Sequence, residues 1–129
     1  MLFAGDIEKK AEQALLEQNP SALAASVLVV PHHGSRSSSS EQWVATVDPD
    51  FAVISVGCNN VYRLPHPAIV ERYQAVAKVL LSSVAGAIQF QLTQGQTVEP
   101  SCFRTLKRRF WHANRREERC GHNVYDRSK

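Results

Sequence analysis

Three short polar clusters within the first 70 residues hold the side chains best suited to chemistry. They are Gly5-Asp6, the run His32-His33-Gly34-Ser35, and a turn from Asn59-Asn60 to His66-Pro67. Carboxylates and neutral imidazoles bind zinc and other divalent metals, whereas hydroxyl and amide groups form hydrogen bonds with substrates. The candidate metal ligands are therefore Asp6, His32 and His33, and the candidate catalytic or substrate-contacting residues are His66, Ser35 and Asn60.

The paired histidines need a particular backbone to act on one ion. Neighbouring side chains of an extended chain point to opposite sides, so His32 and His33 can share an ion only if the loop turns. We expect one imidazole to be a ligand and the other to orient it or to bind substrate. A polar loop that binds no metal is the alternative.

Asp6 and His66 each have a simpler structural interpretation. Asp6 follows a glycine, and its carboxylate is suited to cap the helix that comes next. His66 lies between Pro65 and Pro67, which restrict the backbone and hold the imidazole in one direction. The segment CNNVYRLPHP that contains it is either a plain turn or a phosphate-binding loop using Asn60, Tyr62 and Arg63.

The elements that position these clusters alternate between strand and helix patterns. Apolar strands end at MLFAGD, SVLVVP and DFAVISVG. Helices are predicted over residues 7–18, with an apolar face at Ile7, Ala11, Ala14 and Leu15, and over residues 66–77, with an apolar face at Ile69, Tyr73 and Val76. Between them, SSSSEQWVATV offers serine caps and Glu41 before a short helix. KVLLSSVAGAIQFQL predicts two strands joined by a hairpin at Ala85-Gly86. This alternation indicates an α/β layer, in which ligands bind at the carboxyl ends of the strands.

Composition supports one globular domain followed by a tail whose net charge differs from that of the domain. The chain has 129 residues, 43% of them hydrophobic, and no apolar run near the ~20 residues of a membrane-spanning helix. Its first ten residues do not resemble a secretion signal, so we expect a soluble chain. Residues 1–100 carry a net charge of −3 and residues 101–129 carry +6. We expect the tail to be a basic appendage, helical near 105–119 or disordered, that can contact nucleic acid phosphates or anionic lipid.

Three segments, LFAGDIEKKAEQALL, ASVLVVPHHGSRSSSS and FAVISVGCNNVYRLPHPAIVERY, resemble in order and spacing the C-terminal part of one known domain. This is the metallo-β-lactamase-like domain of the ComEC family of DNA internalisation competence proteins, and the resemblance covers about residues 1 to 90. It implies that residues 1–100 form half of an αββα sandwich with a metal-dependent hydrolase site at the sheet edge. By the same resemblance Asp6 is a bridging metal carboxylate, one of His32 and His33 is a metal ligand, with a slight preference for His32, and His66 lines the substrate pocket.

The resemblance also implies a nuclease that acts on the DNA strand not imported, uses Zn²⁺ or Mn²⁺, and is joined to an inner-membrane channel in the full-length protein.

The sequence differs from the family's pattern in two ways. The family's principal histidine- and aspartate-rich motif is absent, and Arg63-Leu64-Pro65-His66-Pro67 stands where relatives have Gly-His-Pro-His-Pro. We therefore expect a fragment that is inactive alone and binds metal only with the missing N-terminal half, or self-associates to cover its exposed face. The alternative is a non-catalytic DNA-binding or interaction module that uses the basic tail.

Overall fold

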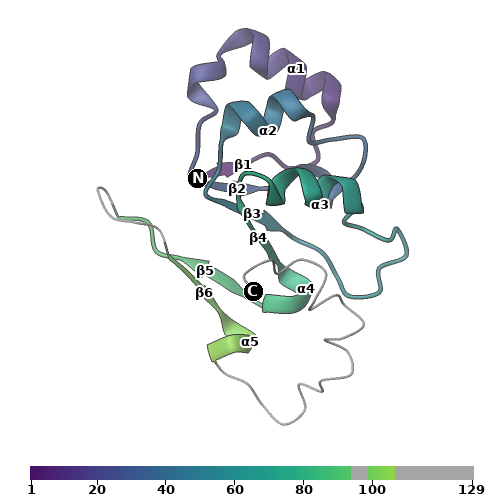
Figure 1. Ribbon diagram of the computed structural model, residues 1–129, viewed down its shortest axis with the longest axis vertical. Helices are drawn as coiled ribbons and strands as arrows, with labels where there is room; N and C mark the ends of the chain where they lie inside the picture. The colour runs from purple at the N-terminus through teal and green to yellow at the C-terminus, as the bar shows by residue number, and fades with distance from the viewer. Residues whose placement is uncertain (94–98, 107–129) are drawn as a thin grey trace.

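The computed structural model describes residues 1–93 and 99–106, and their strands and helices alternate along the chain (Figure 1). The strands are β1 (Leu2–Phe3), β2 (Val27–Val29), β3 (Phe51–Ile54), β4 (Lys78–Leu81), β5 (Ile88–Phe90) and β6 (Pro100–Cys102). The helices are α1 (Lys9–Gln18), α2 (Glu41–Val47), α3 (Pro67–Gln74), α4 (Ser82–Ala85) and α5 (Phe103–Leu106), with short 3-10 turns η1 (Pro20–Ala22) and η2 (Pro31–Gly34). None of the helices in these two ranges is long and apolar enough to cross a membrane.

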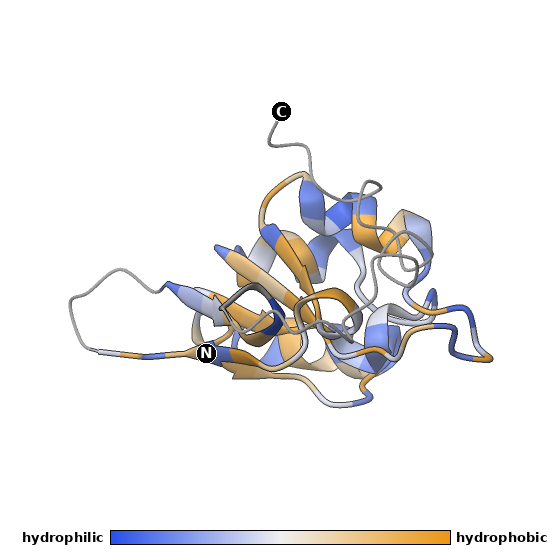
Figure 2. Ribbon diagram, turned by 90° about the horizontal axis from the view of Figure 1, so that it is seen from below, coloured by the Kyte–Doolittle hydropathy of each residue, from blue (hydrophilic) through white to orange (hydrophobic). Residues whose placement is uncertain are grey.

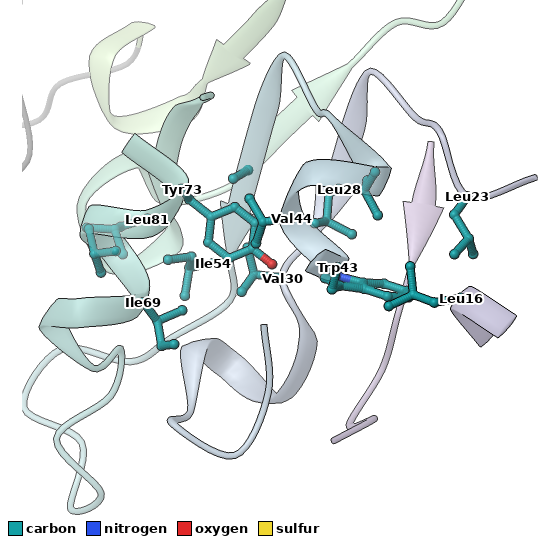
Figure 3. Close-up of a cluster of buried hydrophobic side chains, with 13 residues drawn as sticks. Leu16, Leu23, Leu28, Val30, Trp43, Val44, Ile54, Ile69, Tyr73 and Leu81 are labelled. Atoms are coloured by element: carbon teal, nitrogen blue, oxygen red, sulfur yellow. The ribbon is translucent and has the colours of Figure 1, made fainter. Parts of the chain in front are cut away.

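The first four strands form one parallel sheet in the order β1-β2-β3-β4. One face of this sheet packs against the helices, and the core lies between them (Figure 3). The strands contribute buried residues such as Leu28 and Ile54, and α2 and α3 contribute Trp43 and Tyr73. The expected α/β layer is confirmed, because parallel strands reach their neighbours through helices that cover the sheet.

The opposite face of the sheet carries an apolar row. The strand register aligns Phe3, Val29, Val53 and Leu80 across β1 to β4, and Phe3 is 72% exposed. The separate antiparallel sheet β5-β6 contacts this face where the rings of Phe51 and Phe90 meet, with centroids 5.7 Å apart. A parallel sheet with helices on one face and an apolar row on the other is compatible with half of an α/β sandwich.

Helix α1 buries a different face from the predicted one. Its buried residues are Glu12 and Leu16, whereas Ala11 and Ala14 are exposed and Leu15 is 38% exposed. The Glu12 carboxylate accepts hydrogen bonds from the backbone N–H groups of Ser39 and Ser40, the latter at 2.9 Å. The prediction was wrong because a buried carboxylate that serves two backbone donors does not follow an apolar pattern.

The predicted hairpin at Ala85-Gly86 is also wrong. β4 runs into the helical turn α4, and the Ser82 hydroxyl donates to the Val56 carbonyl (3.0 Å) and accepts from the Val56 N–H (2.8 Å). Gly86, at φ +73°, ends this turn, and β5 then pairs with β6 instead of β4. The bonds to Val56 hold Ser82 against the loop after β3, so the chain leaves the first sheet at this point.

Helices α2 and α3 lie where they were predicted. The Ser40 hydroxyl caps α2 by accepting from the Trp43 N–H (3.3 Å), and α3 buries Ile69 and Tyr73, although Val76 lies beyond its end and is 49% exposed. The predicted boundary at residue 100 falls at the start of β6, which pairs with β5. Most of the basic tail, residues 107–129, lies outside the described residues, and so does most of its predicted helix.

Candidate functional site

The three polar clusters meet at the carboxyl ends of β1, β2 and β3. The His32 N–H donates to the Gly5 carbonyl (2.9 Å), which joins the loop after β2 to the loop after β1. The His66 N–H donates to the Gly34 carbonyl (2.9 Å), which joins the loop after β3 to the loop after β2. The predicted convergence at one sheet edge is therefore present in the structure.

The histidine pair lies in a left-handed turn. His32 and His33 within η2 have φ angles of 48° and 54°, and Gly34 follows at 80°. A left-handed conformation costs a residue other than glycine roughly 1–2 kcal/mol, and such strain is concentrated at functional sites. The turn brings both imidazoles to the sheet edge, but each one faces a different carboxylate.

His33 faces Asp6. Its Nδ1 lies 2.7 Å from the Ser55 carbonyl oxygen and its Nε2 lies 3.8 Å from Asp6 Oδ1. A carbonyl can only accept, so Nδ1 carries the proton and the Nε2 of the neutral ring presents a lone pair toward Asp6. Both side chains are open to solvent, at 50% for His33 and 74% for Asp6. This pairing of a backbone carbonyl with one ring nitrogen is how proteins orient histidine metal ligands.

His32 belongs to a second cluster with Glu8 and Ser37. Its Nδ1 lies 3.3 Å from Glu8 Oε1 and 3.2 Å from Ser37 Oγ, and the Ser37 hydroxyl donates to Glu8 (2.7 Å). The Ser35 hydroxyl lies 3.1 Å from that of Ser37, so the predicted catalytic serine is engaged within the loop. The geometry therefore gives His32 an anchored position in its loop.

Asp6 is not the cap of α1. The N-cap residue is Glu8, which makes no capping side-chain hydrogen bond, and α1 begins at Lys9. The simpler interpretation of Asp6 is therefore wrong, and its carboxylate remains accessible beside His33.

The third cluster is held against the second by close packing. A Cβ atom at Gly34 would lie 2.7 Å from Pro65 Cβ, so glycine permits this approach. The Asn60 side chain donates to the Gly57 and Leu64 carbonyls and accepts from the Leu64 N–H at 2.9 Å. The Asn60 side chain therefore stabilises its own loop.

His66 is the N-cap residue of α3. Its Nδ1 accepts from the Ala68 N–H at 3.3 Å, which places the proton of the neutral ring on Nε2. The ring can therefore donate a hydrogen bond to an anionic group, whereas His33 presents a lone pair.

The distance between His33 and Asp6 fits two ligands of one metal ion. Two ligands at about 2.1 Å from a tetrahedral ion lie about 3.4 Å apart, close to the 3.8 Å between His33 Nε2 and Asp6 Oδ1. In the described residues, however, no three His, Cys, Asp or Glu side chains gather closely enough to hold an ion. Asp6 and His33 could supply a carboxylate and an imidazole to a divalent metal, and the described part of the chain places no third such ligand beside them.

Sequence reasoning missed Glu8, Ser37 and the Ser55 carbonyl. Glu8 lies within the predicted first helix and was not singled out, although its position two residues after Asp6 was a usable signal. The Ser55 carbonyl gives no sequence signal, because any residue type supplies the same backbone group.

Several proteins with known names are similar in sequence to most of the chain. Competence protein ComA of Neisseria gonorrhoeae is 38% identical over 96 residues, which are 74% of this chain and 14% of that protein. ComE operon protein 3 of Bacillus subtilis is 36% identical over 91 residues, which are 70% and 12%. Recombination protein 2 of Haemophilus influenzae is 35% identical over 95 residues, which are 73% and 12%.

These similarities support the expected relationship with ComEC-type competence proteins. The chain spans 12 to 14% of the length of these relatives. No family model matches the chain, and no solved structure matches it. The metallo-β-lactamase-like architecture, the hydrolase chemistry and the metal stay predictions.

Proposed function

We propose that this chain is part of a metal-dependent phosphodiesterase that acts on DNA during bacterial DNA uptake. Its similarity to proteins named for competence supports the DNA-uptake context. One observation carries the chemistry: His33 directs Nε2 toward Asp6 at the carboxyl end of a parallel sheet. Open α/β sheets bind their ligands at this edge.

In this proposal each residue at the sheet edge has a separate role. Asp6 and His33 hold Zn²⁺ or Mn²⁺. The preferred histidine ligand is therefore His33 and not His32. His32 instead keeps the loop in place through Glu8 and Ser37. A bound divalent metal supplies a water of lowered pKa and stabilises charge on the phosphate. His66 donates from Nε2 to a phosphate oxygen.

The chain needs a partner to complete this site. Catalytic zinc sites use three protein ligands, and Asp6 with His33 provides two. The apolar row from Phe3 to Leu80 is suited to pack against a second layer of an αββα sandwich, since parallel sheets are usually covered on both faces. We propose that the N-terminal remainder of the same domain supplies both the ligands and the cover, and that the full-length protein joins it to a membrane channel.

Hydrolysis of DNA tests this proposal. The chain is combined with the preceding part of the domain from one of the related competence proteins, and cleavage of a labelled oligonucleotide is followed with Mn²⁺ or Zn²⁺. We expect cleavage that EDTA abolishes and that Asp6→Asn lowers at least 100-fold, because a metal ligand is lost.

Asp50→Asn is the matched control. Asp50 is an exposed aspartate directly before the amino end of β3, at the opposite edge of the sheet, so its amide variant should cleave as the unmodified chain does. Equal cleavage by the Asp6→Asn variant, or cleavage that persists in EDTA, would refute the proposal.

A further inference from the structure

The loop between β3 and α3 presents an unusual group of exposed residues at its tip. Val61 is 92% exposed, Tyr62 is 83% exposed and Arg63 is exposed beside them. Figures 1 and 2 show this loop projecting away from the body of the molecule, and Figure 2 shows hydrophilic and hydrophobic positions side by side at its end. Most aromatic side chains in a folded domain are buried or half-buried, so an outward tyrosine next to a cation needs an explanation.

The tip, Val61–Arg63, is supported by a turn that side-chain and backbone hydrogen bonds hold together. Asn60 makes three side-chain hydrogen bonds that close the loop beneath the tip, and the Arg63 N–H donates to the Asn60 carbonyl at 3.1 Å. Asn59 and Arg63 both have left-handed backbones, at φ 55° and 53°. At the base of the loop Pro65 packs against Gly34. The fold therefore holds Tyr62 and Arg63 outward at a fixed place.

This place adjoins the candidate metal site. The His66 N–H binds the Gly34 carbonyl, and His33, the partner of Asp6, directly precedes Gly34.

We propose that the tip is a clamp for single-stranded nucleic acid, in which Tyr62 stacks on a base and Arg63 contacts a neighbouring phosphate. For its position beside a phosphodiesterase site, this inference rests on the proposed function. Proteins hold single strands with the same pair of groups, an aromatic platform for the base and a cation for the backbone. In a duplex the bases are already stacked on one another, so Tyr62 would have no free base to meet.

The chemistry fits other partners less well. A lipid surface needs a larger apolar group than Val61 and Tyr62 provide. A protein partner would be expected to meet a broader patch than these adjacent residues.

Fluorescence anisotropy with a labelled oligothymidine tests the clamp on the full chain in EDTA, so that binding is measured without metal. We expect Tyr62→Ala to weaken binding about tenfold, as loss of one stacked base does. Tyr62→Phe should bind within about twofold of the unmodified chain, because it keeps the ring. Arg63→Gln should make binding less dependent on salt concentration, because about one phosphate contact is lost.

Val76→Ala is the control, since Val76 is also an exposed apolar residue but follows α3. All four variants should keep the thermal unfolding midpoint, because the side chains concerned are solvent-exposed. Binding of Tyr62→Ala equal to that of the unmodified chain would overturn the inference, as would equal losses for Tyr62→Ala and Tyr62→Phe.

If Tyr62→Ala instead loses binding to phosphatidylglycerol vesicles and keeps oligonucleotide binding, the tip would be assigned to a membrane. Intact binding without hydrolysis in the complemented domain would refute the phosphodiesterase and leave the clamp standing.

Discussion

At the scale of residues, neighbouring imidazoles differ because their ring nitrogens face different groups. His33 Nδ1 faces the Ser55 carbonyl, whereas His32 Nδ1 faces the Glu8 carboxylate and the Ser37 hydroxyl. His66 uses Nδ1 as an acceptor. These contacts determine which nitrogen of each ring is left for a metal or a phosphate, and this selection is what the proposed chemistry depends on.

The tautomers of the neutral rings can be measured on the chain itself. We expect His33 to carry its proton on Nδ1 and His66 to carry its proton on Nε2, for the hydrogen-bonding reasons given above. Long-range proton–nitrogen NMR correlations of the neutral rings report the protonated nitrogen directly. An Nε2-protonated His33 would contradict the orientation of its lone pair toward Asp6.

The sequence predicted that Asp6, the histidine pair and His66 lie at one edge, because parallel strands end at the same edge. It did not predict which histidine faces Asp6. That choice depends on the left-handed turn at His32 and His33, and apolar patterns carry no information about such a torsion.

At the scale of elements, the loops after β2 and β3 hold each other in position. Gly34 has a positive φ of 80° and leaves no room for a Cβ beside Pro65, so its loop can approach the one that carries His66. A side chain at Gly34 would push the two loops apart and separate His33 from His66.

Substitution Gly34→Ala measures this contact. We expect it to lower the free energy of unfolding by about 1–3 kcal/mol, from backbone strain and the clash with Pro65. Urea denaturation gives the difference. Gly57→Ala is the matched control, because a Cβ there meets nothing within 4 Å, and it should change stability by about 0.5 kcal/mol or less. Equal effects of the two substitutions would mean that the close approach at Gly34 does not matter.

Strong periodic elements were predictable and their pairings were not. The helix α3 and strands β2 and β3 follow from apolar runs bounded by proline and glycine. The turn at α4 depends on hydrogen bonds from Ser82 to Val56, 26 residues away, and β5 finds its partner in β6. The buried face of α1 likewise depends on Glu12 meeting Ser39 and Ser40. Contacts between distant segments decided these features, and local patterns do not report them.

At the scale of the whole molecule, two features bear on the proposed sandwich: the apolar row on the sheet face opposite the helices, and the pairing of Asp6 with His33. Phe3, Val29, Val53 and Leu80 line a face opposite the helices, and Asp6 and His33 face each other at the edge of the same sheet. In the proposed sandwich a second layer covers the row and brings the remaining ligands to the edge. Metal binding and completion of the fold should then occur together.

Zinc uptake by calorimetry tests this account most directly, with the chain alone and with the chain joined to the preceding part of the domain from a related competence protein. We predict weak or undetectable uptake by the chain alone, tight uptake by the joined domain, and a loss of affinity of at least 100-fold for Asp6→Asn in the joined domain, whereas Asp50→Asn binds normally. Tight uptake that is indifferent to Asp6, or none in a joined domain that folds, would contradict the assignment of this sheet edge as a metal site.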